Sequence, residues 1–181
     1  MFDLSKDAGP IGFNTFLAAG EFLINHLDLH ANTSRIAISG FKEQLENVVS
    51  FSSDDSTSEL LKKVFTLKQS SDQYQLNASD LLQSISDAIE YPQRRQVVVI
   101  FTQGGSVVNI GDAFHQYRAT SGVRVSTVGH GSDANVNSHT ALASDTAFTF
   151  YLGRELDTDV TVLGALLSLL EYDTCVGSNT G

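Results

Sequence analysis

The sequence has little positive charge, a single cysteine and no apolar run long enough to span a bilayer. Eleven Lys and Arg stand against 21 Asp and Glu, so the formal net charge is −10 at pH 7. Nucleic-acid-binding proteins need basic patches that neutralise phosphates, and anionic membrane surfaces attract basic segments. The composition therefore argues against nucleic acid and membranes as partners.

The sequence also lacks the hydrolase signatures G-x-S-x-G and H-E-x-x-H. Its histidines are scattered without metal-ligand spacing and are interpreted as surface or helix-capping residues: His26, His30, His115, His130 and His139. The lone Cys175 is either a free thiol or half of a disulfide whose partner lies outside this chain. These features favour a protein that is not an enzyme.

The 181 residues are enough for one domain, expected over residues 1–173 and followed by a flexible tail over 174–181. Apolar residues at helical spacing predict six helices, at about 12–27, 57–65, 78–90, 110–121, 136–143 and 160–170. Runs rich in β-branched residues predict strands at 35–41, 48–51, 97–101, 123–128 and 148–152, after a short first strand at Met1-Phe2. This alternation predicts an α/β fold: a three-layer α/β/α, doubly wound, mostly parallel six-stranded sheet.

Three local patterns add detail to this fold. The strands at 35–41 and 48–51 are expected to form a hairpin, which supplies one antiparallel edge strand. The tetrapeptide Ser56-Thr57-Ser58-Glu59 matches a capping box at a helix start. The continuous apolar run at 97–101 is typical of a central parallel strand that is covered on both faces.

Acidic and hydroxyl side chains cluster at the start of the chain, where Asp3, Ser5 and Asp7 follow Met1-Phe2. Residues two apart in an extended segment point to the same side, and the carboxyl ends of parallel strands form the ligand crevice of such sheets. Hard oxygen ligands suit Mg²⁺ or Ca²⁺. The alternative is that Asp3 and Ser5 only bond loop backbone or cap the following helix.

The ordered set of segments resembles a von Willebrand factor type A domain, also called integrin I-like, over nearly the whole chain. No single segment carries the resemblance, but their order does. The segment Phe2-Asp3-Leu4-Ser5-Lys6-Asp7 is similar to the family's Asp-x-Ser-x-Ser, and Arg35-Ile36-Ala37-Ile38 is similar to its second strand. Residues 97–105 are similar to a fourth strand that ends Thr-Asp-Gly, and residues 123–131 are similar to the fifth strand. Leu142-Ala143-Ser144-Asp145 is similar to the segment before the sixth strand.

The resemblance implies a metal-ion-dependent adhesion site made of five side chains on three loops. Asp3 and Ser5 match this pattern, and Asp7 stands where the second serine would be. Leu76 replaces an expected threonine and Gln103 an expected aspartate. The site is therefore expected to be degenerate, with no cofactor or with a weakly bound Mg²⁺ or Ca²⁺ on Asp3, Ser5 and Asp7.

The first strand is unusually short for this family, because only Met1 and Phe2 precede Asp3. A short central strand leaves neighbouring backbone groups unpaired, so the first strand is expected to be truncated and to continue upstream. The resemblance further implies that this upstream segment carries the disulfide partner of Cys175, since many extracellular members join their two ends in this way.

The resemblance implies a non-enzymatic protein–protein interaction and adhesion module of a secreted extracellular matrix protein. Its expected partners are collagen or other matrix proteins, with further type A modules or oligomerisation in the parent protein. Two glycosylation sequons, at Asn32 and Asn77, weakly support secretion.

Two alternatives remain open at this point. The first is a divalent-metal-dependent adhesion domain that uses Asp3, Ser5 and Asp7. The second is an enzyme that handles a phosphoester or nucleotide, suggested by the G-x-G-x-x-A pattern at residues 129–134 and by Asp3, which is similar to the nucleophile of haloacid dehalogenase-type enzymes. Those enzymes need a second aspartate at the position that Ser5 occupies here. Turn glycines explain the pattern at 129–134 better than a nucleotide site does.

Overall fold

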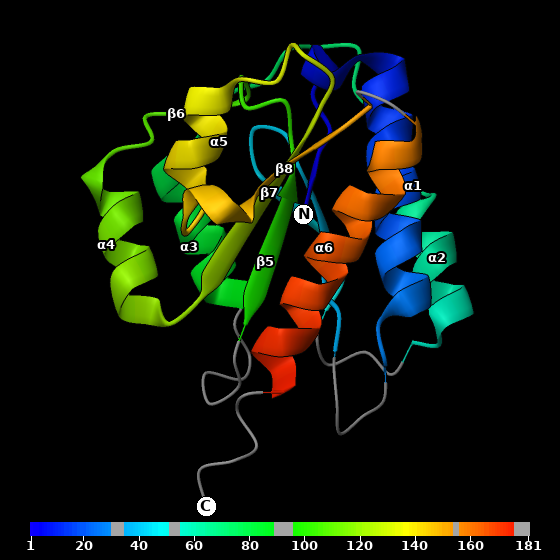
Figure 1. Cartoon of the computed structure of the whole chain (residues 1–181). Coiled ribbons are helices and arrows are strands. Elements are labelled where there is room, and N and C mark those ends of the chain that lie inside the picture. Colours follow the sequence, from blue (N-terminus) through cyan, green and yellow to red (C-terminus); the bar gives the residue numbers. More distant parts are fainter. Residues whose placement is uncertain (30–34, 51–54, 89–95, 154–155, 176–181) are drawn as a thin grey trace, which may run out of the picture.

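A six-stranded sheet forms the centre of the molecule in the computed structural model, which describes residues 1–29, 35–50, 55–88, 96–153 and 156–175 (Figure 1). Neighbouring strands are parallel except for one antiparallel pair at an edge. The order across the sheet is β3 (Leu45–Val49), β2 (Ile38–Phe41), β1 (Phe2–Asp3), β5 (Val97–Phe101), β7 (Arg124–His130) and β8 (Thr149–Leu152). The predicted α/β fold, with its antiparallel edge strand, is confirmed.

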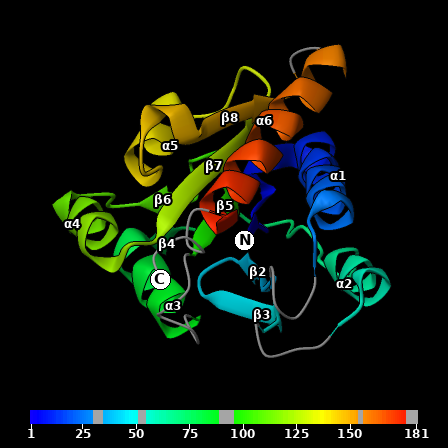
Figure 2. The ribbon, with the colours of Figure 1, turned by 60° about the horizontal axis from the view of Figure 1, so that its bottom comes forward.

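Helices cover both faces of this sheet (Figures 1 and 2). One face carries α1 (Gly9–His26), α2 (Thr57–Val64) and α6 (Leu156–Cys175), and the other carries α3 (Ala78–Ala88), α4 (Asp112–Ser121) and α5 (Val136–Leu142). Each face has its own apolar core. Successive strand residues point to opposite faces, so Ile100 lies in one core and Phe101 in the other, where its ring stacks on Phe2 at 4.7 Å.

Local signals in the sequence set several helix ends. Ser56 Oγ accepts the backbone N–H of Glu59 at 3.4 Å, and the Glu59 carboxylate accepts the N–H of Ser56 at 2.9 Å, which confirms the predicted capping box of α2. Gly122 ends α4 in the left-handed conformation, with φ 69°. Pro10 lies in the first turn of α1, where its missing N–H is tolerated.

Two glycines allow β1 to lie very close to its neighbours. A Cβ atom on Gly20 of α1 would lie 2.6 Å from the Phe2 ring, and one on Gly40 of β2 would lie 2.5 Å from Leu4 Cδ1. A larger residue at either position would force the Phe2 ring or the Leu4 side chain to shift.

The predicted hairpin is confirmed, but β3 begins at Leu45, three residues before the predicted start. A second sheet of two parallel two-residue strands, β4 (Leu76–Asn77) and β6 (Val107–Val108), was not predicted. Helix α6 continues to Cys175, so the first two residues of the predicted tail are helical. Residues 176–181 lie outside the described residues, as does Asn32.

None of the helices in the described ranges is both long and apolar enough to cross a membrane.

Candidate functional site

The polar cluster predicted from the sequence lies where β1 and β5 end. These strands are parallel neighbours, with Phe2 opposite Phe101, so the residues that follow them meet at one edge of the sheet. Asp3 ends β1, Thr102 follows β5, and Ser106 lies four residues further along. This edge is at the top of Figure 1.

The Asp3 carboxylate is completely buried and is held by three protein donors. Its Oδ1 accepts the backbone N–H of Ser5 at 3.0 Å, and its Oδ2 accepts the hydroxyls of Thr102, at 2.8 Å, and Ser106. A buried carboxylate without such donors would carry a large desolvation penalty. These bonds tie the loop after β1 to the loop after β5.

Ser5 positions the short segment that follows. Its side chain is buried and accepts the backbone N–H of Asp7 at 3.4 Å, which caps the 3₁₀ helix η1 (Lys6–Ala8). The Ser5 carbonyl accepts the Gln69 side-chain amide at 3.0 Å. The backbone N–H of Ser70 donates to the Leu4 carbonyl at 2.7 Å, so residues 69–70 hold this segment in place.

Asp7 lies beside Asp3 but is less well satisfied. Its Oδ2 atom is buried and has no hydrogen-bond partner within the described part of the chain. Burial raises the pKa of the Asp7 carboxyl, and the charge of Asp3 raises it further, while Lys6 and a hydrogen bond from Gln73 oppose this shift. Gly105 lies against this carboxylate, since a Cβ there would be 2.9 Å from Oδ2.

Gln103 is bonded to the end of β7. Its Nε2 donates to the His130 carbonyl at 2.9 Å, and its Oε1 accepts the His130 backbone N–H at 2.8 Å. Both ends of the amide are therefore used in fixing β7 to the loop after β5. Gln103 is a neutral amide at the position where the family resemblance implies a carboxylate. Here it joins the loop after β5 to the end of β7.

Leu76 and Asn77 lie on the small second sheet. Leu76 is buried in the core under α3, as its apolar side chain requires. Asn77 is exposed, and its Oδ1 accepts the Asn109 side-chain amide at 2.6 Å. Neither residue bonds to Asp3.

A family model for the von Willebrand factor type A domain matches residues 1–160. The chain belongs to this family. The family assignment predicted from the sequence is thereby confirmed, while the matrix subtype and the state of the metal site remain proposals.

Several solved structures share the fold of this A domain. Proximal thread matrix protein 1 from the mussel byssus superimposes with a TM-score of 0.74 at 15% identity, covering 93% of this chain and 44% of that one. The manganese-loaded TRAP protein of Plasmodium vivax gives 0.71 at 19% identity, covering 91% and 69%. BatB of Bacteroides thetaiotaomicron, described as a conserved hypothetical protein, gives 0.69 at 12% identity, covering 94% and 96%.

The A domain thus spans less than half of the mussel protein's chain. One structure of that protein is described as having a zinc-occupied MIDAS motif. No curated protein matches the sequence.

The residues of this A domain do not fit a complete cation site. Asp3 directs both oxygens to protein donors, Gln103 is bonded to β7, and Leu76 is in the core. Across the described ranges, no group of three or more His, Cys, Asp or Glu is arranged to hold a metal ion. The unpartnered Asp7 oxygen is the feature that favours a cation.

Two residues of the site were missed or misread in the sequence. Ser106 was not predicted, because its approach to Asp3 depends on the turn at Gly104, with φ 84°, and no spacing signals it. His139 was interpreted as a surface or capping residue, but it is completely buried beneath the site, so that interpretation was wrong.

The glycine pattern at residues 129–134 has a packing explanation. A Cβ on Gly129 would lie 2.8 Å from Ala134 Cβ and 2.9 Å from His139 Nε2. Glycine is therefore needed where β7 passes under α5, without reference to a nucleotide.

Proposed function

We propose that this A domain is a non-enzymatic module of a secreted matrix protein, that it binds collagen or another matrix protein, and that binding needs no metal ion. The proposal that binding needs no metal ion is supported by the three protein donors that already bond to the Asp3 carboxylate. A carboxylate already satisfied by the protein supports the two loops structurally, and a cation would have to displace those donors.

Two further observations support the adhesive part of the proposal. Members of the family are typically non-catalytic binding modules. The mussel protein that shares the fold is named a matrix protein of the byssus, which favours a matrix role by analogy of fold.

Three exposed apolar side chains indicate where a protein partner would bind. Ile11 is 76% exposed, Val136 54% and Val160 65%. They lie near the starts of α1, α5 and α6, which begin at the edge of the sheet where Asp3 lies (Figure 1). We call these three side chains the apolar rim. Exposed apolar side chains such as these are typically buried in the core of a protein–protein contact.

Binding to immobilised collagen, measured by surface plasmon resonance with and without EDTA, tests the proposal. Binding should persist in EDTA, and Ile11→Asp should weaken it at least about tenfold, because a charge would be placed within the apolar contact. Ala165→Asp is the matched control, since Ala165 is an exposed residue in the middle of α6 and gains the same charge.

Loss of binding in EDTA would contradict metal independence. Equal weakening by Ile11→Asp and Ala165→Asp would contradict the apolar rim, because a general charge effect would then explain both. Absence of binding to collagen with EDTA and without it would remove collagen as the partner.

A divalent-cation site on Asp3, Ser5 and Asp7 is the second candidate, favoured by the buried Asp7 oxygen without a partner. Titration calorimetry with Mg²⁺ and Ca²⁺ tests it. This candidate requires binding heat that Asp7→Asn abolishes and that Asp87→Asn, an exposed control at the end of α3, leaves unchanged. No heat with the unmodified chain would remove it.

A further inference from the structure

Helix α5 covers β7 and β8 on one face of the sheet, and few side chains hold it there (Figure 1). Of its seven residues, His139 and Leu142 are the two that are buried. The bond from the Thr127 hydroxyl of β7 to the His139 carbonyl is long, at 3.5 Å. A helix this short is not stable by itself, so its position depends on these contacts. One of its two buried side chains is an imidazole, which can take up a proton.

The imidazole of His139 is closely packed and completely buried. A Cβ on Gly129 would lie 2.9 Å from its Nε2, so the ring rests on the backbone of β7. The Tyr151 ring of β8 meets it edge-on, with 5.3 Å between the ring centroids. Neither ring nitrogen has a hydrogen-bond partner among the described residues. A proton added to this ring would therefore place a charge without a counter-charge in a buried space.

The charged groups of the surrounding elements are directed elsewhere. On β7, His130 points to the opposite face, where its ring lies against the start of α1. In the turn before α5, Asp133 is exposed. Thr102 has its backbone beside the imidazole and its hydroxyl bonded to the Asp3 carboxylate. Tyr151, the titratable side chain in contact with the imidazole, is a phenol, and phenols are neutral in acid.

Both flanks of α5 are fastened to other elements. Before the helix, the Asn135 N–H donates to the Gln103 carbonyl at 2.9 Å. After it, the Ser144 N–H donates to the Val125 carbonyl and the Ser144 hydroxyl accepts the Val125 N–H, both at 2.8 Å. Residues 136–143 lie between these two attachments, so they can move together without loss of either one.

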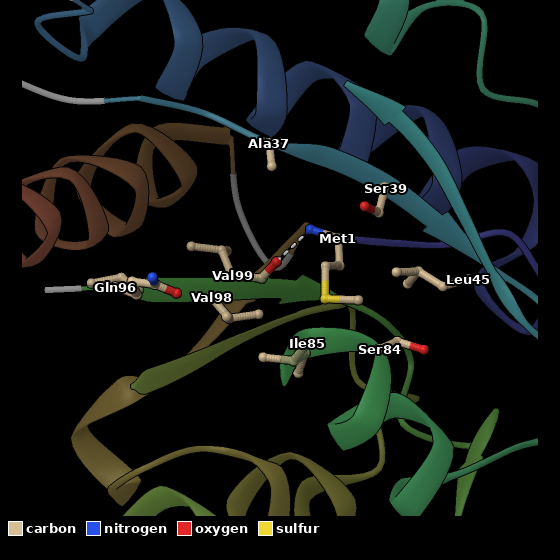
Figure 3. Close-up of a pocket in the computed structure, with 10 residues that line it drawn as sticks. Met1, Ala37, Ser39, Leu45, Ser84, Ile85, Gln96, Val98 and Val99 are labelled. Carbon is tan, nitrogen blue, oxygen red and sulfur yellow. Dashed lines mark hydrogen bonds between the residues drawn. The ribbon is translucent and has the colours of Figure 1, made fainter. Parts of the chain in front are cut away.

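The hollow drawn in Figure 3 gives solvent no path to the imidazole. It lies between β1, β2, β5 and α3, and none of its described lining residues belongs to α5, β7 or β8. Since His139 is completely buried, a proton reaches its ring when α5 opens locally.

Opening of this segment would change the edge of the sheet that carries Asp3. Val136, in the first turn of α5, belongs to the apolar rim. Gly104, in the loop after β5, packs on the same turn, since a Cβ there would lie 3.0 Å from Ser138 Cβ. Movement of α5 therefore displaces part of the rim and removes a support of the loop after β5.

We propose that residues 136–143 are an acid-sensitive segment, which opens away from β7 as a unit when His139 takes up a proton, while the six-stranded sheet stays folded. The segment acts as a pH-dependent device at the edge of the sheet. This inference concerns the segment itself and holds whether or not the apolar rim binds collagen.

Proton linkage gives the size of the effect. Burial lowers the pKa of His139 to about 4 in the closed segment, against an ordinary 6.5. The open segment therefore binds the proton more tightly, so the closed form is fully favoured above about pH 6.5 and loses stability as the pH falls toward 4. Between pH 7 and pH 4.5 the ratio of open to closed segments should rise by about 50-fold.

Native-state hydrogen exchange at increasing urea concentrations tests the proposal. The Ala143 N–H, which donates to the His139 carbonyl at 2.9 Å, reports on α5. The Leu4 N–H, which donates to the Phe41 carbonyl at 3.0 Å, reports on the sheet at β2. From pH 7 to pH 4.5, the protection factor at Ala143 should fall by about 50-fold and should depend little on urea. Leu4 should stay better protected, with the steep urea dependence of global unfolding.

Variants identify the group that takes up the proton. In His139→Leu and in His139→Gln, protection at Ala143 should change by less than about threefold between the two pH values. His115→Gln alters an exposed histidine of α4 and should keep the full loss. A full loss that persists in both His139 variants would overturn the proposal.

Two results with the unmodified chain would also overturn it. One is equal protection at Ala143 at pH 7 and pH 4.5. The other is a loss at Ala143 that Leu4 shares with the same urea dependence, because the whole fold would then be opening and α5 would not be a separate segment.

Discussion

At the scale of single residues, the main feature is a buried aspartate held by neutral donors. The sequence predicted that Asp3 and Ser5 would lie at the end of the first strand, because their spacing and position were visible. One alternative drawn from the sequence was that Asp3 bonds to loop backbone. The Ser5 backbone N–H does donate to the Asp3 carboxylate. The hydroxyl of Ser106 could not be predicted, since its position comes from the fold of the loop after β5.

Removing one of these donors should destabilise the fold. In Ser106→Ala, Asp3 Oδ2 keeps the Thr102 hydroxyl but loses its second donor in a site without access to water. The free energy of unfolding should fall by about 1–3 kcal/mol, measured by urea titration. Ser132→Ala removes an exposed hydroxyl that bonds Asp133, and it should change stability by less than about 0.5 kcal/mol. Similar values for both variants would refute the importance of the Ser106 bond.

His139 makes the fold sensitive to acid. Burial lowers its pKa to about 4 from an ordinary 6.5, although the Thr102 backbone opposes this in part. The unfolded chain therefore takes up a proton below about pH 6.5 that the folded chain resists, so stability is lost as pH falls from about 6.5 toward 4. At 1.36 kcal/mol for each pKa unit, the loss approaches about 3 kcal/mol.

Urea titrations at pH 7 and pH 4.5 measure this loss. His139→Leu should lose clearly less stability between these two pH values than the unmodified chain does. His115→Gln alters an exposed histidine and should keep the full loss. An unchanged pH dependence in His139→Leu would assign the acid sensitivity to other groups.

At the scale of helices and strands, the elements with longer apolar patterns in the sequence were predicted more accurately. The strand at 97–101 was predicted at its observed bounds, because five apolar residues in succession are a strong signal. The start of β3 was misplaced, since Leu45-Glu46-Asn47 lacks a β-branched residue and is held by its pairing with β2. The two-residue strands β4 and β6 are too short to show any alternation, and they exist through tertiary contact alone.

The capping box of α2 gives a test at this scale. Ser56→Ala removes the side-chain acceptor for the Glu59 N–H and should lower the free energy of unfolding by about 0.5–2 kcal/mol. Ser58→Ala is the control, because Ser58 is exposed within the same first turn and alanine is the better helix former there. Guanidinium titrations of both variants should show a loss for Ser56 only. A loss for Ser58 as large as that for Ser56 would mean that α2 does not depend on its cap.

At the scale of the whole molecule, the layers and the edge that carries the polar cluster followed from the alternation of segments. The chemistry of that cluster did not, because it depends on which side chains turn toward Asp3. Gln103 follows β5 as predicted, yet its amide turns to His130.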